Sequence, residues 1–195
     1  MPVDSLFLSA AAAELRSRLL GSRIDKIQQP EKDVLFLSMR GPGGPCRVLV
    51  SAGSGTARVH VTKGGRENPA EPPMFCMLLR KHLTGGRLTA LEQPDMDRLY
   101  LMRFACLDEL GVPSEKTLAV EMLGRAANLI LIDGDGRIID CLRRIDAEQS
   151  SKRQLLPGLY YTLPPRPEKP DFFRLSAQEL DRLLAGADGS KPGDL

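Results

Sequence analysis

The chain has 195 residues, of which 42% are hydrophobic, and 27 basic against 25 acidic side chains give it a net charge of +2. This length suits one domain of ordinary size followed by a tail. The small net charge does not by itself indicate a nucleic-acid-binding protein, although it leaves room for a local basic patch. With two histidines and four single cysteines, we expect no metal site and no cofactor.

The start of the chain predicts a cytoplasmic protein. Residues 1–4 lead directly into an amphipathic segment, without the apolar run and basic flank of a signal peptide. No stretch approaches the length of apolar sequence that spans a membrane, so we expect no membrane contact. The cysteines form no C-x-x-C pair and lie mostly within apolar patterns, which is typical of buried, reduced thiols in the cytosol.

The first predicted element is a helix from Ser5 to Leu20, which ends at Gly21. Its buried face is expected to comprise Leu6, Ala10, Ala13 and Leu19. Strands are then predicted at residues 23–28, 34–40, 47–51 and 57–61. The Gly-Pro-Gly-Gly-Pro segment at residues 41–45 lacks the Gly-Lys-Ser/Thr ending of a phosphate-binding loop, so we interpret it as a hairpin turn.

A second helix is expected from Pro72-Pro73 onward, because proline is well tolerated in the first turn of a helix. Residues 74–79 are apolar on every face, so this helix, Met77 included, is predicted to be buried all round. Strands follow at residues 87–92, 98–106, 117–122, 129–133 and 138–143. Residues 133–136 resemble part of a calcium loop without its downstream glutamate, and we interpret them as a hairpin turn.

Residues 85–101 repeat residues 21–37 at an offset of 64 positions. Both copies contain a glycine that ends a helix, a strand, a Gln-Pro-acid-x-Asp turn and a returning strand. In the returning strands the alternating positions are Leu35, Leu37 and Met39 in the first copy and Leu99, Leu101 and Arg103 in the second. Two copies are too few for a solenoid, so the sequence predicts one domain built from two related halves.

The two copies differ after the aspartate of the turn, where Asp33 precedes Val34 but Asp97 precedes Arg98. An aspartate present in both copies indicates a structural role, because its carboxylate can accept hydrogen bonds from backbone N–H groups of the turn. An arginine present in one copy needs its own explanation. A functional contact and a local Asp97–Arg98 ion pair explain it about equally well.

The sequence contains no catalytic motif that we can identify, neither a nucleophile elbow nor paired carboxylates in a cleft, and it predicts a protein that is not an enzyme. The remaining candidates are basic residues near predicted turns, whose side chains suit phosphate groups. For any one of them a solvated surface position is the commoner explanation. They are Arg58, Arg80, Lys81, Arg87, Arg98, Arg125, Arg143, Arg144, Lys152 and Arg153.

A domain boundary is expected near residue 165, where Pro164-Pro165-Arg166-Pro167 indicates a linker. Residues 1–165 then form one domain, and residues 166–195 comprise the linker and the start of a further, helical domain. Ser176 and Glu179 have the spacing of a capping box that begins a short helix ending near Gly186.

Several motifs together resemble the N-terminal domain of the RqcH/NEMF family, the NFACT N-terminal domain, which is also called the fibronectin-binding protein A N-terminal domain. The resemblance covers about residues 1–165, and the run Pro-Pro-Met-Phe-Cys-Met-Leu-Leu-Arg-Lys-His-Leu at residues 72–83 is its most specific part. The other motifs are residues 21–27, 29–32, 68–69, 93–94 with 97–98, 121–125 with 128, and 156–158. Ala126-Ala127 depart from the family, which often has His-Ser there.

The resemblance implies an α+β fold in which duplicated helix-plus-antiparallel-strand units form a two-sheet β-sandwich flanked by helices. Such a fold is similar to the N-terminal domain of formamidopyrimidine-DNA glycosylases. The resemblance also implies a cytoplasmic ribosome quality-control factor that binds tRNA on the large ribosomal subunit obstructed by peptidyl-tRNA. There it supports mRNA-independent tailing of the stalled chain, with alanine in bacteria, together with downstream domains of the same protein.

The family's tRNA-recruiting Asp-Arg pair falls on Asp97 and Arg98. Possible supporting RNA contacts are Arg125, Arg80, Lys81 and Asn128. Two alternatives come from other classes of protein. One is an extracellular adhesin for fibronectin, which the absence of a signal peptide and the unpaired cysteines argue against. The other is a DNA glycosylase with the amine of Pro2 as nucleophile, where Val3 replaces the glutamate that this chemistry uses.

Overall fold

The computed structural model describes residues 4–108, 110–165 and 175–186. The chain divides into two compact units, Met1–Tyr161 and Thr162–Leu195. The second contains α3 (Ala177–Gly186), and the expected capping box is confirmed: Glu179 accepts hydrogen bonds from the backbone N–H and the hydroxyl of Ser176, while Ser176 Oγ accepts from the Glu179 N–H. The domain boundary near residue 165 stays a prediction.

The first unit contains two helix-plus-four-strand halves, as the repeat predicts. The first half comprises α1 (Ser5–Leu19), β1 (Arg23–Glu31), β2 (Val34–Gly41), β3 (Gly44–Ser51) and β4 (Arg58–Thr62). The second comprises α2 (Met74–Leu83), β5 (Arg87–Glu92), the 3-10 turn η1 (Pro94–Met96), β6 (Leu99–Leu107), β7 (Pro113–Glu121), the 3-10 turn η2 (Gly124–Ala126), β8 (Asn128–Ile132) and the additional β9 (Ile138–Cys141).

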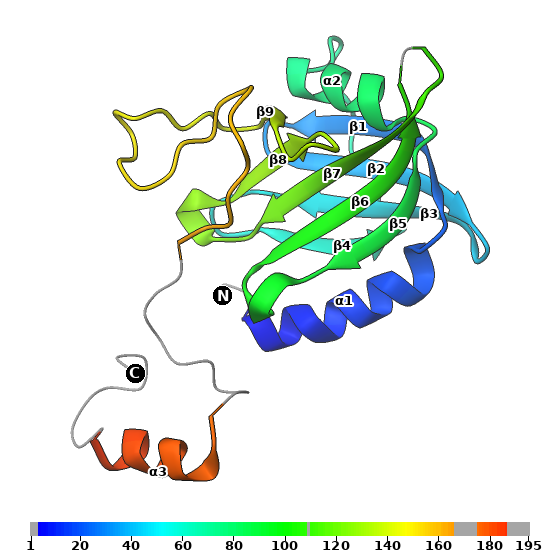
Figure 1. Ribbon diagram of the computed structural model, residues 1–195. Coiled ribbons are helices and arrows are strands. Elements are labelled where there is room, and N and C mark those ends of the chain that lie inside the picture. The colour runs from blue at the N-terminus through cyan, green and yellow to red at the C-terminus, as the bar shows by residue number, and fades with distance from the viewer. Residues whose placement is uncertain (1–3, 109, 166–174, 187–195) are drawn as a thin grey trace. The chain divides into compact units, whose positions relative to one another are not determined.

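The nine strands form one antiparallel sheet in the order β4-β3-β2-β1-β5-β6-β7-β8-β9. The halves join through the short β1–β5 pairing around Arg23 and Arg87. Figure 1 shows the strands of the two halves in front of one another, with α1 and α2 at opposite ends of this arrangement. The α+β fold is therefore confirmed, and the two layers of the expected sandwich are parts of one continuous, folded-over sheet.

The main core lies between the two layers and the helices. It contains residues of both helices and of strands β1 to β8, among them Leu15, Leu37, Leu79, Phe104 and Leu131, each almost fully inaccessible to solvent. A smaller apolar cluster forms on the outer face of β7 to β9, where Leu155 of the following segment covers Ile130 and Ile138. That segment also adds backbone hydrogen bonds to the β9 edge, so it is part of the folded unit rather than a free exit.

Each helix packs against the strands of the other half: α1 contacts β5, and α2 contacts β1. Two equivalent arginines form hydrogen bonds between each helix and a strand of the other half. Arg16 on α1 donates from Nε to the Leu91 carbonyl at 2.6 Å, and Arg80 on α2 donates from Nε to the Ile27 carbonyl at 2.9 Å. The two donors, Arg16 and Arg80, are 64 positions apart in the sequence, and so are the two acceptors, Ile27 and Leu91. The duplication is therefore visible in individual hydrogen bonds as well as in the strand order.

The same relation holds where the helices end. Gly21 and Gly85 both have the positive φ that an L side chain rarely adopts, at 78° and 80°. Arg23 donates to the Gly85 carbonyl at 3.0 Å, and Arg87 donates to the Gly21 carbonyl at 2.8 Å. Arg87, one of the basic candidates from the sequence, is thus part of the junction between the halves.

The buried faces of both helices differ from expectation. On α1 the buried residues are Leu8, Ala12, Leu15 and Leu19, whereas Leu6, Ala10 and Ala13 face solvent. Alanines on every side of this helix made the apolar stripe ambiguous. On α2, Met74 and Met77 are 84% and 48% exposed. The expectation of a helix buried all round was wrong because the sheet covers only one side of α2, the side of Phe75, Cys76, Leu79 and Leu83.

The β6 strand lies one residue out of the register that the repeat indicated. Ile27 pairs with Leu37, and its equivalent Leu91 pairs with Met102, so the offset grows from 64 to 65 after the turn. The buried positions are accordingly Leu35, Leu37 and Met39 in β2 and Tyr100, Met102 and Phe104 in β6. Leu101 and Arg103 lie on the opposite face. The cause is the η1 turn, which is one residue longer than the β1–β2 turn.

Candidate nucleic-acid interface

The η1 turn places Asp97 and Arg98 at the start of β6. Asp95 and Met96 have positive φ values of 49° and 57°, a conformation that is uncommon for residues other than glycine. The Gln93 amide holds the turn, because its Nε2 donates to the Ser5 carbonyl at 2.9 Å and to the Asp97 carbonyl at 3.0 Å. The turn is thereby fixed to the first residue of α1.

The Asp97 carboxylate engages backbone rather than the neighbouring guanidinium. Its Oδ1 accepts a hydrogen bond from the Arg98 N–H at 2.6 Å, and the Arg98 carbonyl accepts from the Met122 N–H at 2.8 Å. Within the described ranges, no hydrogen bond or ion pair reaches the Arg98 guanidinium. The interpretation of Asp97-Arg98 as a local ion pair is therefore wrong, and the partly buried arginine has side-chain donors without a partner among the described residues.

The corresponding turn of the first half holds an aspartate at the position of Arg98. Because of the longer η1 turn, Asp33 is the structural equivalent of Arg98, whereas the sequence repeat aligned it with Asp97. Asp33 is tied inward: its Oδ2 lies 3.8 Å from Arg143, whose guanidinium also donates to the carbonyls of Ala52 and Ala127. One copy of the turn thus binds another part of the domain, and the other presents a cation to its surroundings.

Arg125 lies near Arg98, in the η2 turn that follows β7. The last pair of the β6–β7 ladder is Leu99 with Glu121, and Met122 bonds Arg98, so both turns are at the same end of these strands. Arg125 is exposed and has no hydrogen bond or ion pair among the residues described. Arg98 and Arg125 therefore form the basic part of the candidate interface.

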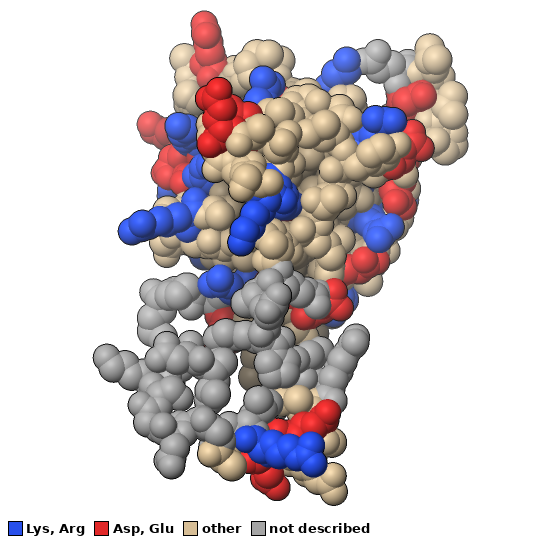
Figure 2. All heavy atoms as spheres, turned by 60° about the vertical axis from the view of Figure 1, so that its left-hand side comes forward, with Lys and Arg blue, Asp and Glu red and all other residues tan. Residues whose placement is uncertain are grey.

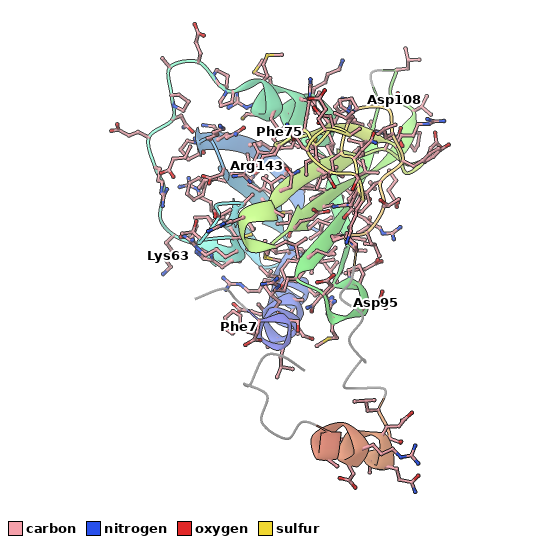
Figure 3. All side chains as sticks on the ribbon, turned by 90° about the vertical axis from the view of Figure 1, so that its left-hand side faces the viewer. Phe7, Lys63, Phe75, Asp95, Asp108 and Arg143 are labelled. Atoms are coloured by element: carbon pink, nitrogen blue, oxygen red, sulfur yellow. The ribbon has the colours of Figure 1, made fainter. Side chains whose placement is uncertain are left out.

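The remaining candidates do not join Arg98 and Arg125 at the surface: Asn128 lies at the same end of the strands but is buried, and Arg80 and Lys81 lie elsewhere. Asn128 is 1% exposed, and its amide donates to the Arg143 carbonyl at 2.7 Å and accepts from the Arg143 N–H at 2.9 Å. This residue positions Arg143 and does not reach the surface. Arg80 and Lys81 are on α2, and Figure 3 shows Asp95 of the η1 turn beside α1, at the opposite end of the domain from α2. The structure thus separates them from Asp97 and Arg98.

The family model for the NFACT N-terminal and middle domains matches residues 4–192. The chain belongs to this family. It is 38% identical over 190 residues to the Rqc2 homolog RqcH of Bacillus subtilis, covering 97% of this chain and 33% of that protein. It is 32% identical over 152 residues to the ribosome quality control complex subunit 2 of Saccharomyces cerevisiae, covering 77% of this chain and 14% of that protein. The chain spans about a third of the length of its bacterial relatives.

Solved structures agree with the NFACT assignment. The N-terminal domain of the fibronectin-binding protein PavA from Streptococcus pneumoniae superimposes with a TM-score of 0.86 at 34% identity, over 93% of this chain and 68% of that one. The N-terminal part of the fibronectin/fibrinogen-binding protein from Streptococcus suis gives a TM-score of 0.86 at 35% identity, with the same coverage. The comparison with formamidopyrimidine-DNA glycosylases stays a prediction, and Pro2 lies outside the described residues.

Several basic residues of this NFACT domain serve its internal structure. Arg153 donates to both carboxylate oxygens of the buried Glu121, at 2.6 and 3.0 Å, and Tyr161 donates to the same carboxylate at 2.9 Å. Burial and the adjacent Glu121 carboxylate raise the pKa of Tyr161. No local sequence pattern connects residues that are 40 positions apart, so Glu121 and Tyr161 are not among the candidates visible in the sequence.

The face of the NFACT domain seen in Figure 2 carries lysines and arginines interspersed with acidic side chains, without one continuous basic patch. A nucleic-acid contact on this face would therefore depend on particular side chains rather than on a general positive field. Across the described part of the chain, no group of histidine, cysteine and acidic residues could hold a metal ion, and no helix is long and apolar enough to cross a membrane.

The thiols are free, and burial raises the pKa of Cys76, Cys106 and Cys141, the last to about 11.

Proposed function

We propose that this chain is the tRNA-binding N-terminal part of a ribosome quality-control factor. In this proposal it recruits alanine tRNA to a large ribosomal subunit obstructed by peptidyl-tRNA, in the cytoplasm. It supports the mRNA-independent alanine tailing of the stalled chain without itself being an enzyme. The names of the relatives from Bacillus subtilis and Saccharomyces cerevisiae support the ribosomal part of this proposal, and downstream domains would take part in it.

The observation that carries the tRNA contact is the unengaged Arg98 guanidinium on a turn whose backbone is fixed. Gln93 and Asp97 hold the backbone on either side of the arginine, so binding has to order the Arg98 side chain but not the turn that carries it. A guanidinium presented in this way suits a phosphate or a guanine edge, because both accept two parallel hydrogen bonds. Arg125 on the neighbouring turn would add a second phosphate contact.

The test is fluorescence anisotropy of labelled alanine tRNA with the chain and its Arg98→Ala variant, over a series of salt concentrations. We expect the variant to bind at least about tenfold more weakly, as for loss of a charge-assisted bidentate contact, and to fold normally. Arg18→Ala is the matched control, because Arg18 is an exposed arginine whose i,i+4 ion pair with Glu14 is worth little. Equal affinity of the Arg98 and Arg18 variants would refute the proposal.

The names of the solved neighbours favour one second candidate, fibronectin binding. It is tested by surface plasmon resonance of the chain over immobilised fibronectin, with the Arg98→Ala variant in parallel. We expect no saturable binding at micromolar concentration. Saturable binding that is indifferent to Arg98 would assign a second, independent activity to the domain.

A further inference from the structure

Two adjoining hollows lie beside the β1–β2 turn, between β1, α2 and the segment that precedes α2. One, of about 210 Å³, is lined by Lys26, Gln28, Gln29, Arg80, Asn68, Pro69, Ala70 and Pro72. The other, of about 430 Å³, is mainly apolar and includes Phe75 and Leu142, together with the charged residues Glu31 and Lys32 of the turn. Gln29 and Pro69 line both hollows. Figure 3 shows Phe75 far from Asp95, so these hollows are separate from the Arg98 turn.

Gln29 has a buried side-chain acceptor at these hollows. The residue is 3% exposed, and its Nε2 donates to the Lys32 carbonyl at 2.9 Å. That bond fixes the orientation of the amide, because its oxygen cannot face a carbonyl. The Oε1 atom is buried and has no hydrogen-bond partner among the described residues. Buried acceptors are nearly always paired in native proteins, so Oε1 calls for a donor from outside the chain.

The equivalent glutamine of the second half shows what is different at Gln29. Gln93 holds its own turn in the same way, through the Asp97 carbonyl, and in addition binds the Ser5 carbonyl at the start of α1. The position equivalent to Ser5 is Pro69, which lines both hollows beside Gln29. The glutamine that binds the start of α1 in one half therefore lines two hollows in the other, where its Oε1 is buried without a partner among the described residues.

Two cations lie at the polar hollow. Lys26 is exposed and makes no hydrogen bond or ion pair with the part of the chain that is described. Arg80 uses Nε for the Ile27 carbonyl, and one of its terminal nitrogens lies 4.0 Å from Met77 Sδ, a weak contact. Its remaining donors can bind an anion. The site therefore combines positive charge, an unpaired acceptor and an apolar recess.

We propose that the two hollows bind one unstacked nucleotide of single-stranded RNA. The base enters the apolar hollow beside Phe75 and Leu142 and donates an N–H to Gln29 Oε1, and its phosphate lies against Lys26 and Arg80. Unpaired RNA bases are recognised in this way, by apolar or aromatic surfaces and by hydrogen bonds to the base edge. The inference rests on the proposed RNA-binding function and adds a second contact to it, on another side of the domain.

The direct test is NMR of the isotope-labelled chain, read at the Gln29 side-chain amide. A short, unstructured RNA of mixed sequence should shift this signal and those of the Phe75 ring, whereas the same strand annealed in a duplex should not. In anisotropy with the single strand, Lys26→Ala should weaken binding roughly threefold to tenfold and lower the salt slope by about one. Lys63→Ala, which removes an exposed lysine elsewhere, is the matched control and should have a much smaller effect.

The outcomes separate this inference from the proposed function. If Gln29 does not respond to RNA, or responds equally to inorganic phosphate alone, the hollow holds only water or an anion and the inference is wrong. Loss of tRNA binding by Arg98→Ala would still support the proposed function in that case. If Gln29 responds and Lys26→Ala weakens binding while Arg98→Ala has no effect, the nucleotide site stands and the assignment of tRNA binding to Arg98 fails.

Discussion

The β1–β2 and β5–β6 turns share one sequence pattern but differ in the side chain that follows it. In each, a glutamine donates to a backbone carbonyl of the turn, from Gln29 to Lys32 and from Gln93 to Asp97. At the next position, Asp33 is tied to Arg143 inside the domain, whereas no partner within the described ranges engages the Arg98 side chain. Both turns keep the glutamine hydrogen bond, whereas the next side chain differs, Asp33 in one turn and Arg98 in the other.

This difference indicates where function can arise in a duplicated domain. The residues that bind backbone of the opposite half, such as Arg16 and Arg80, are constrained in both copies by carbonyls that need a donor. A residue at the tip of a turn has no such constraint. A single added residue in η1 then suffices to place an arginine where the other half has an aspartate.

The largest expected effect concerns a second contrast between the halves, where Ser51 of β3 corresponds to the buried Glu121 of β7. Arg153→Ala removes the guanidinium that pairs with Glu121 and leaves its charge buried. We expect a loss of about 3–5 kcal/mol in the free energy of unfolding, measured by urea denaturation. Arg144→Ala removes an exposed ion pair with Asp140 and is the control, with a much smaller loss. Similar losses for both variants would contradict the view that Arg153 stabilises the domain by pairing with the buried Glu121.

A smaller effect on stability is expected at the two turns, where Arg143 and Arg98 can be compared. Arg143→Ala deprives the carbonyls of Ala52 and Ala127 of a donor, and we expect it to cost about 1–3 kcal/mol of stability. Arg98→Ala removes a side chain without an internal partner and should change stability by less than about 0.5 kcal/mol. Thermal unfolding of both variants beside the parent measures the contrast. An Arg98 variant as unstable as the Arg143 variant would show that Arg98 has a structural role.

The next effect depends on pH. The pKa of Tyr161 is raised in the folded state by burial and by Glu121, so its contribution to stability is complete below the unfolded pKa of about 10 and is lost above it. Tyr161→Phe should therefore flatten the fall in unfolding free energy above about pH 10, by up to about 1.4 kcal/mol per pH unit. Tyr160→Phe alters an exposed ring and should leave the parent profile unchanged. A Tyr161 variant with the parent's profile would exclude this linkage.

The last prediction compares the two sides of α2. Met77 is half-exposed, as is typical of a helix with one side against a sheet, so Met77→Asp should fold and lose less than about 1 kcal/mol. Leu79→Asp places a charge in the core and should prevent folding. Circular dichroism melts of the two variants measure the difference. Unfolding of both would restore the interpretation of α2 as buried on every face.

The order of elements and the duplication were readable from the sequence because they depend on local chemistry. Glycines at helix ends, proline turns and alternating apolar residues predicted the nine strands and both helices of the first unit to within a few residues. In the structure the Leu123–Asn128 segment corresponds to Gly53–Arg58, since the β3–β4 and β7–β8 pairings end at equivalent residues. Helix faces were less readable where alanine or methionine occurs on every side.

For the candidate site, the sequence by itself identified the pair Asp97-Arg98, because an unmatched arginine in a repeat is visible without coordinates. Only the tertiary structure decided that Asp33, rather than Val34, is the equivalent of Arg98, since one additional residue in a turn shifts the pairing of every residue that follows. It also decided that Asn128, Arg143 and Arg153 serve internal contacts. Whether a polar side chain faces solvent or a buried carbonyl depends on residues far along the chain, and the folded-over sheet alone brings these together.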